Sequence, residues 1–388
     1  MEKYKACLEY IDEYWEKITY FFPEDEGTRI GLPHHFVSPN DTYFKNDQFY
    51  WDTYFVCLGL LAKDETHLVK GIVENFLFLQ KRFGVIPLRN QFYNLGISQP
   101  PFLSSLVLAV YEKTKNKRWL AEMAHVLEKE LQSYWIDKDK KKHHVLACGL
   151  SRYCDHEITH VTAEHESGWD MTSRFNDHCL NYAPIDLNSL LYKYETDLAE
   201  IYKELNNTTK SEQYASLAEK RKKLINKYCW HEKQGFFYDY NHEEKKQSSF
   251  FSLAGFYPLW AGLATEHQAH KMKHHIAQFE CEGGLANTQK NNLSEEFKQW
   301  DYPNGWPNQQ LIVISGLAKY GFMDDANRLA RKWLDLNNKI FTETKTLWEK
   351  YDVVAKTKGK DGRYPTQSGF GWTNAVFILL YDFLKKNS

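Results

Sequence analysis

The chain has 388 residues, a formal net charge of −2, 43% hydrophobic residues and 16% aromatic residues. The near-zero charge offers no field that would attract nucleic acid or anionic lipid, and no apolar run reaches the roughly 18 residues of a membrane span. We therefore expect a water-soluble protein without a nucleic-acid or membrane partner, and so many aromatic side chains exclude a disordered chain.

The cysteines and the amino-terminal residues predict a cytoplasmic location. The seven cysteines are scattered and form no C-x-x-C motif. An odd number without regular spacing favours reduced thiols over a disulfide framework or a zinc site. The first ten residues alternate charged and apolar side chains, unlike the continuous hydrophobic segment of a secretory signal.

Helical periodicity recurs along the whole chain. The first segment carries apolar residues at i, i+3, i+7 and i+10, namely Leu8, Ile11, Trp15 and Ile18. Comparable segments are expected at 52–63, 66–82, 101–115, 117–134, 186–205, 210–228, 252–263, 265–278, 307–320, 323–337 and 370–386.

These twelve segments predict an all-α fold, because strand signals are sparse and the best of them is Gly235–Tyr240. Paired helices without interleaved strands favour an (α/α)6 barrel, in which alternate helices face inward. No linker marks a boundary, so we expect a single domain over residues 1–388. A tetratricopeptide-like solenoid is the alternative, but there is no fixed 34-residue repeat.

The connections between the expected helices are long and rich in Trp, Tyr, Gly, Asp and Asn. They cover about 21–51, 83–100, 135–185, 279–306 and 338–369. Loops of this length in a compact domain usually have a function. We expect them to build the walls of a binding site on the helical scaffold.

Two loop carboxylates in aromatic surroundings are candidates for acid–base catalysis. Asp170 follows Gly168 and Trp169, and packing against an indole would raise its pKa and suit it to donate a proton. Its alternative role is to cap a helix. Glu349 lies between Trp348 and Tyr351 in the sequence. The alternative is that Glu349 is an ordinary solvent-exposed loop residue. Such a pair fits glycoside hydrolysis, which in its inverting form uses one acid and one base.

Three further segments, 48–54, 299–306 and 367–374, combine aromatic side chains with amides and carboxylates. Aromatic rings cover the C–H faces of a pyranose, while Asp, Asn and Gln bind its hydroxyl groups. A single aromatic residue is more commonly part of the core, but repeated Trp-Asp and Gly-Trp pairs in loops favour a sugar site. The predicted pocket residues are Tyr50, Trp51, Asp52, Gly168, Trp169, Trp300, Asp301, Trp306 and Trp372.

The segment His156–His160 matches H-E-x-x-H, the zinc-peptidase motif, which requires a helix. The β-branched Ile158 and Thr159 disfavour a helix there. No G-x-G-x-x-G or P-loop motif is found either. We therefore predict no metal and no cofactor.

The chain resembles the trehalases and their clan relatives, which include processing α-glucosidase I and the mannosylglycerate and glucosylglycerate hydrolases. The matching segments, which run in order through nearly the whole chain, are Tyr50–Tyr54, Ser98–Pro101, Glu166–Asp170, Gln299–Trp306, Glu349–Asp352 and Gly369–Asn374. The resemblance implies an (α/α)6 barrel and a metal-independent inverting hydrolase, with Asp170 as general acid and Glu349 as general base. It also implies that Trp51, Asp52 and Gln99 hold the sugar that is cleaved off.

Several positions depart from the trehalase pattern. Phe44 and Ile97 stand where trehalases have Arg, Leu88 where they have Asn, and Arg363 where they have Glu. Loss of a polar contact to a buried hydroxyl can change specificity by orders of magnitude. Arg363 and Arg152 could each bind a carboxylate of the aglycone through two hydrogen bonds. The alternative for each is a structural ion pair with a loop Asp or Glu.

We therefore expect an inverting α-glycosidase whose partner is a small α-glucoside or α-mannoside. The departures make glucosylglycerate and mannosylglycerate the leading substrates, with trehalose as the alternative. The alternative from another functional class is a protein without catalytic activity, either a sugar-binding protein or a helical scaffold for protein partners. It is disfavoured because both carboxylates stand in intact motifs. The sequence does not indicate an oligomeric state.

Overall fold

The computed structural model describes residues 1–136, 143–290 and 296–387. Its α-helices are α1 (Lys5–Ile18), α2 (Tyr50–Ala62), α3 (Thr66–Phe83), α4 (Leu103–Thr114), α5 (Lys117–Glu130), α6 (His160–Ser167), α7 (Ile185–Glu204), α8 (Thr208–Tyr228), α9 (Tyr257–Trp260), α10 (Glu266–Lys273), α11 (Pro307–Lys319), α12 (Met323–Thr344) and α13 (Gly371–Lys386).

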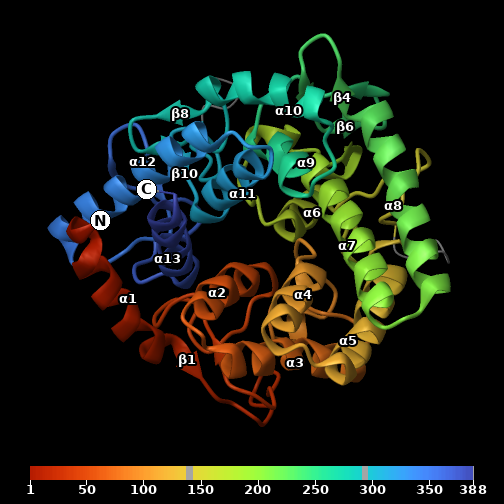
Figure 1. The fold of residues 1–388 in the computed structure, drawn as a ribbon, viewed down its shortest axis with the longest axis horizontal. Coiled ribbons are helices and arrows are strands. Elements are labelled where there is room, and N and C mark those ends of the chain that lie inside the picture. The colour runs from red at the N-terminus through yellow and green to blue at the C-terminus, as the bar shows by residue number, and fades with distance from the viewer. Residues whose placement is uncertain (137–142, 291–295, 388) are drawn as a thin grey trace.

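The helices form two concentric rings (Figure 1). The inner ring consists of α2, α4, α7, α9, α11 and α13, in which each helix contacts the next and α13 contacts α2. The outer ring consists of α1, α3, α5, α8, α10 and α12. Successive helices thus alternate between the outer and the inner ring, with α6 as an insertion between α5 and α7. This is the expected (α/α)6 barrel.

Amphipathicity separates the two rings. The outer helix α12 buries one stripe, which includes Leu329, Trp333, Leu336 and Ile340. The inner helix α2 is buried on nearly all sides, as expected for a helix enclosed by neighbours. The α2–α13 contact is close at Gly59, where an added Cβ would lie 2.6 Å from an α-carbon of α13.

Helix α12 continues to Thr344, past its expected end at 337, and the expected helix over 265–278 is α10 followed by a 3-10 helix (His274–Gln278). Two other segments differ more from the prediction. The expected helix over 252–263 is a 3-10 turn (Leu253–Phe256) followed by the short helix α9, which Gly262 ends in a left-handed conformation (φ +71°). Helix α6 lies where the sequence predicts a loop. It begins only at His160, after the Thr159 side chain caps it by accepting a hydrogen bond from a backbone N–H. The β-branched residues before it remain outside the helix, so the H-E-x-x-H segment lies mostly in a turn.

Short antiparallel strands connect the helix ends. They are β1 (Thr19–Tyr20), β2 (Phe36–Val37), β3 (Tyr182–Ala183), β4 (Trp230–His231), β5 (Phe236–Phe237), β6 (Tyr240–Asn241), β7 (Lys246–Gln247), β8 (Glu280–Cys281), β9 (Gly284–Leu285), β10 (Asn304–Gly305), β11 (Tyr351–Asp352) and β12 (Thr357–Lys358). The predicted strand over 235–240 therefore contributes to two strands, β5 and β6. The sheet β10–β11–β12 pairs Gly305 with Tyr351, which brings the loop before α11 beside the loop that carries Glu349.

Across the described residues, no helix combines the length and apolar character that crossing a bilayer requires. All seven cysteines lie within the described ranges, and each is a free thiol.

Candidate active site

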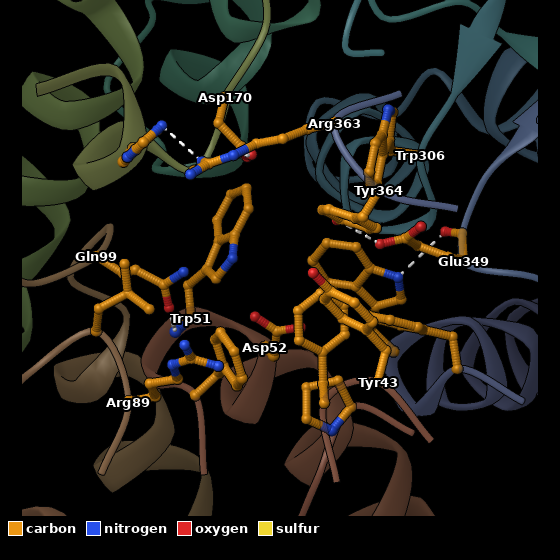
Figure 2. Close-up of a pocket in the computed structure, with 18 of the residues that line it drawn as sticks. Tyr43, Trp51, Asp52, Arg89, Gln99, Asp170, Trp306, Glu349, Arg363 and Tyr364 are labelled. Carbon is orange, nitrogen blue, oxygen red and sulfur yellow. Dashed lines mark hydrogen bonds and ion pairs between the residues drawn. The ribbon is translucent and has the colours of Figure 1, made fainter. Parts of the chain in front are cut away.

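A cavity of about 330 Å³ opens at the end of the barrel where the inner helices α2, α11 and α13 begin. Trp51 and Asp52 enter it from the first turn of α2, Trp306 from the residue before α11, and Trp372 from the first turn of α13. These groups form its buried floor. The loops between the helices supply the remaining walls (Figure 2).

Asp170 lies in the loop that follows α6 and faces this cavity (Figure 2). Gln299 Nε2 donates hydrogen bonds to its backbone oxygen at 3.2 Å and to Oδ2 at 3.4 Å, and Arg363 Nη1 lies 3.7 Å from Oδ2. Burial raises the pKa of Asp170 to about 6, with Glu349 acting in the same direction and the Arg363 charge opposing it. The carboxyl is thus protonated in mildly acidic solution and can donate a proton.

Gly168 fixes the path of this loop. It ends α6 with φ +72°, a conformation that favours glycine. An added Cβ would lie 2.5 Å from Cζ2 of the Trp51 indole, so this position also makes room for the ring. The backbone N–H of Trp51 in turn donates to Gln99 Oε1 at 3.1 Å, which links the predicted sugar-binding residues to each other.

Glu349 enters the cavity from another side (Figure 2) and is 1% exposed. Tyr364 donates its hydroxyl to Oε1 at 2.7 Å, and Lys350 Nζ donates to Oε2 at 3.0 Å. Lys350 is itself fully buried, with its ammonium group 5.0 Å from the centre of the Trp306 ring. The Gln367 backbone N–H also lies 3.5 Å from Oε2, so three donors hold the carboxyl group, which faces the same cavity as Asp170.

Asp52 is a third carboxyl of the cavity and is 6% exposed. Burial raises its pKa to about 8, and the nearby charges of Glu349 and Asp170 add to the effect. Asp52 is therefore protonated at neutral pH. A neutral carboxylic acid at this position can donate a hydrogen bond to a hydroxyl group of a ligand.

The trehalase family model matches residues 3–164 and 159–385. The chain belongs to the trehalase family. It is 32% identical to the cytosolic neutral trehalase of Saccharomyces cerevisiae over 94% of this chain and 58% of that protein. It is 33% identical to a probable trehalase of Eremothecium gossypii over 92% of this chain and 58% of that protein. The chain thus spans less than two thirds of the length of these relatives.

A solved structure agrees with this family assignment, and a second one shares the fold. The neutral trehalase of Saccharomyces cerevisiae superimposes with a TM-score of 0.80 at 31% identity, over 90% of this chain and 74% of that one. A mannosylglycerate hydrolase from Thermus thermophilus superimposes with a TM-score of 0.69 at 16% identity, over 97% and 99%. The second likeness is one of fold alone.

In this trehalase-family chain the structure brings most of the predicted site residues to one cavity. They are Trp51, Asp52, Gln99, Gly168, Asp170, Trp300, Trp306, Glu349, Arg363 and Trp372. These residues come from segments that lie far apart in the sequence, and the closed inner ring brings them together.

Tyr50, Trp169 and Asp301 stand behind the lining instead of forming part of it. Tyr50 donates its hydroxyl at 2.6 Å to a buried carboxylate at the end of α5. Trp169 is fully buried and packs on Trp300 with ring centres 5.3 Å apart. Asp301 accepts the Thr172 hydroxyl at 2.8 Å. They brace the cavity from outside, because their side chains point into the surrounding core and loops.

Arg152 does not line the cavity, contrary to the suggestion that it meets an aglycone. Its Nε donates to the His143 backbone oxygen and its Nη1 to the Leu180 backbone oxygen, both at 2.9 Å. It therefore ties two loops together. Among the described residues there is no cluster of three or more His, Cys, Asp or Glu suited to hold a metal ion.

The lining also includes residues that were not among the predicted site residues, and Tyr43, Arg89, His165 and Tyr364 are four of them. Arg89 pairs with a buried Asp at 3.0 Å. His165 Nε2 accepts a hydrogen bond from Arg363 Nη1 at 2.6 Å. Burial, together with the Arg363 charge, lowers the pKa of His165 to about 4, so the ring is neutral and can accept. Nothing in the local sequence distinguishes these residues from other loop residues.

Proposed function

We propose that this chain is an inverting glycoside hydrolase that cleaves a small α-glycoside, with trehalose as the first candidate substrate. The observation that carries the proposal is the pair Asp170 and Glu349, which face one cavity from two different loops in a trehalase-family barrel. The relatives at 32–33% identity that are named trehalases support trehalose. This reverses the order of substrates that the sequence departures favoured.

The two carboxyl groups have complementary roles in this mechanism. Asp170, protonated before the reaction, gives its proton to the glycosidic oxygen as the bond from that oxygen to the anomeric carbon breaks. Glu349 takes a proton from a water molecule, whose oxygen attacks the anomeric carbon from the opposite face. The product sugar has inverted configuration, and each carboxyl group recovers its starting state by exchanging one proton with solvent.

The cavity floor supports this chemistry by holding the sugar in an environment with little water. Trp51, Trp306 and Trp372 line the cavity with aromatic surface for the C–H groups of a pyranose, and Asp52 and Gln99 provide polar atoms for its hydroxyl groups. Water exclusion strengthens the electrostatic stabilisation of the positive charge that develops on the sugar ring.

The test uses Asp170→Asn and Glu349→Gln, which keep side-chain shape and remove the acid or the base. Each variant should reduce trehalose hydrolysis at least about 10³-fold while the far-ultraviolet circular dichroism spectrum stays unchanged. Asp324→Asn, an exposed residue on α12, is the matched control and should retain full activity. Proton NMR should at first show α- and β-glucose in equal amounts, because only the cleaved sugar inverts and the leaving glucose keeps its α configuration. Initial release of α-glucose alone, or near-normal activity in either catalytic variant, would contradict the assignment.

A second candidate substrate is an α-glycoside with an acidic aglycone, such as glucosylglycerate or mannosylglycerate. The specific observation is Arg363, whose side chain is 51% exposed at the cavity although it also contacts His165 and Asp170. A screen of trehalose, glucosylglycerate, mannosylglycerate and a short α-gluco-oligosaccharide separates the candidates. We expect the largest kcat/KM for trehalose; the largest value for a glycerate glycoside would favour the second candidate.

We also propose that the protein acts in the cytosol and that residues 1–388 form one catalytic domain. The location is supported by relatives that are named cytosolic neutral trehalases. Cell fractionation followed by detection of the protein tests the location.

A further inference from the structure

The contacts from neighbouring side chains to the carboxyl group of Asp170 are long. Gln299 Nε2 lies 3.4 Å from Oδ2, and Arg363 Nη1 lies 3.7 Å from the same oxygen. Both distances exceed the normal range of an N–H···O hydrogen bond. Glu349, in contrast, has side-chain donors at 2.7 and 3.0 Å. The direction of the Asp170 carboxyl group therefore depends mainly on the backbone that carries it.

The backbone turns sharply on both sides of Asp170. Gly168, two positions before it, has φ +72°, and Met171, directly after it, has φ +68°. Glycine adopts this left-handed conformation without steric cost, but in methionine the Cβ is crowded against the backbone. A methionine therefore remains in this conformation only where other contacts hold it.

Glu164 provides such a contact from helix α6. Its Oε1 accepts a hydrogen bond from the Met171 backbone N–H at 2.7 Å and lies 3.4 Å from the Thr172 backbone N–H. Glu164 precedes Asp170 in the sequence, whereas Met171 and Thr172 follow it. The Glu164 side chain thus bridges the two sides of the turn that carries Asp170, and it binds the N–H of the left-handed residue itself.

The segment before α11 holds the other side of this turn. The Trp300 backbone N–H donates to the Met171 backbone oxygen at 3.2 Å, and Gln299 Nε2 donates to the Asp170 backbone oxygen at 3.2 Å. Trp300 also lines the cavity, and Gln299 also reaches the Asp170 carboxyl group, so substituting either side chain would disturb the site directly. Glu164 does not line the cavity, and its influence on a bound substrate therefore passes through the turn.

Glu164 can accept the Met171 hydrogen bond in either protonation state. Burial raises its pKa to about 7, against the opposing effects of the Met171 hydrogen bond and the Lys298 charge. A carboxyl oxygen accepts from an N–H whether or not the group is charged, and the side-chain oxygen of glutamine does the same. Methionine has a similar length but only a weak acceptor. The two replacements at position 164 therefore differ mainly in the hydrogen bond.

We propose that Glu164 is a positioning residue for the general acid. Its hydrogen bond to the Met171 N–H holds the left-handed turn and thereby the direction in which Asp170 presents its proton. The inference rests on the proposed function for the role of Asp170. A displaced acid should impair only those reactions whose leaving group needs a proton. A displacement of about 1 Å at a catalytic group can lower a rate by about 10²-fold.

The experiment compares trehalose with α-glucosyl fluoride in the full chain carrying Glu164→Met or Glu164→Gln. Glucose leaves trehalose as an alcohol and needs a proton, whereas fluoride leaves as a weakly basic ion and does not. In both reactions Glu349 takes the proton of the attacking water. Glu164→Met should lower kcat for trehalose about 10²-fold and change KM less than about threefold, while kcat/KM for α-glucosyl fluoride stays within about threefold of the wild type. Glu164→Gln should keep both activities within about threefold of the wild type.

Glu157→Met is the matched control, because Glu157 is an exposed residue that precedes α6. It should leave both activities unchanged. A thermal melt of each variant verifies folding, and activity on α-glucosyl fluoride shows that the rest of the site is intact. Glu164→Ala, which removes the acceptor without adding a long apolar side chain, replaces Glu164→Met if that variant does not fold.

The outcomes separate this inference from the proposed function. A selective loss on trehalose in Glu164→Met that is absent in Glu164→Gln supports the positioning role. Equal losses on the two substrates, unchanged trehalose hydrolysis, or the same loss in Glu164→Gln overturns it. Asp170→Asn, measured alongside, should show a larger selective loss. Normal trehalose hydrolysis by Asp170→Asn refutes the proposed function, whereas a selective loss in Asp170→Asn without one in Glu164→Met refutes only the positioning role.

Discussion

Replacing Asp52 with asparagine tests the energetic consequence of a buried carboxyl in the cavity floor. Its pKa is raised from 3.8 to about 8, mainly because burial disfavours the charged form. A group whose pKa is raised by folding contributes stability that is fully present below the unfolded-state pKa and is lost as pH rises toward the folded-state value. Asp52 therefore destabilises the native protein increasingly between pH 3.8 and about pH 8.

The magnitude follows from the pKa difference. At pH 7 Asp52 keeps its proton in the folded protein but has lost it in the unfolded chain, because pH 7 is roughly three units above the unfolded-state pKa. This difference lowers the free energy of unfolding by about 4 kcal/mol. An asparagine side chain at this position would have nearly the same shape as the protonated carboxyl but cannot ionise. The free energies of unfolding of Asp52→Asn and wild type should thus be within about 1 kcal/mol at pH 4 and differ by about 4 kcal/mol, in favour of the variant, at pH 7.

Urea denaturation followed by tryptophan fluorescence at several pH values between 4 and 7 measures this difference. Asp170 is present in both proteins, so its contribution to the pH dependence of the free energy of unfolding cancels in the difference. Asp324→Asn on the exposed side of α12 removes a surface carboxyl and is the control; it should differ from the wild type much less than Asp52→Asn does at pH 7. Parallel pH dependences for Asp52→Asn and wild type would refute the reasoning, because they would mean that Asp52 is ionised in the folded protein.

Two further results are expected. Asp170 is the proposed acid and its pKa is about 6, so kcat/KM should fall as pH rises past this value. Arg363→Met removes the cation that lowers this pKa and should move the descending limb to higher pH; an unmoved limb would argue against Asp170 as the titrating group. Gly168→Ala adds a Cβ 2.5 Å from the Trp51 ring at φ +72° and should reduce the free energy of unfolding by about 2–4 kcal/mol in urea denaturation. Gly84→Ala, at φ +76° with no atom within 4 Å, should reduce it by only about 1 kcal/mol, and equal losses would exclude the ring contact as the cause.

The barrel could be predicted because the apolar residues of a long amphipathic helix recur at helical spacing, and this spacing can be read from the sequence of the helix itself. In α12 the buried side chains recur at helical spacing, and that spacing is visible without any knowledge of the partners. The short helices could not be predicted in the same way. Helix α6 has only eight residues and no clear apolar stripe, and its existence depends on the Thr159 cap and on the Gly168 end. Such short elements are stabilised by the surrounding structure more than by their own sequence.

The site was predictable where aromatic residues and carboxylates adjoin in sequence, as at Asp170 and Glu349. Other parts depend on contacts between distant loops. Arg363 and His165, which share a hydrogen bond, are 198 positions apart, so nothing near either residue indicates the partner. The same limit explains why the role of Arg152 was predicted wrongly. Its guanidinium binds backbone oxygen atoms, and such contacts leave no signal in the sequence.

The contact between α2 and α13 has a consequence for how the protein is made. Helix α13 follows all the other helices in the sequence, yet it covers one flank of α2 and carries Trp372 to the cavity. During synthesis α2 emerges before α13 and keeps that apolar flank exposed until α13 leaves the ribosome. We therefore expect nascent chains to depend on chaperones while the segment from α2 to α13 is translated, and the cavity to be complete only after α13 has packed against α2.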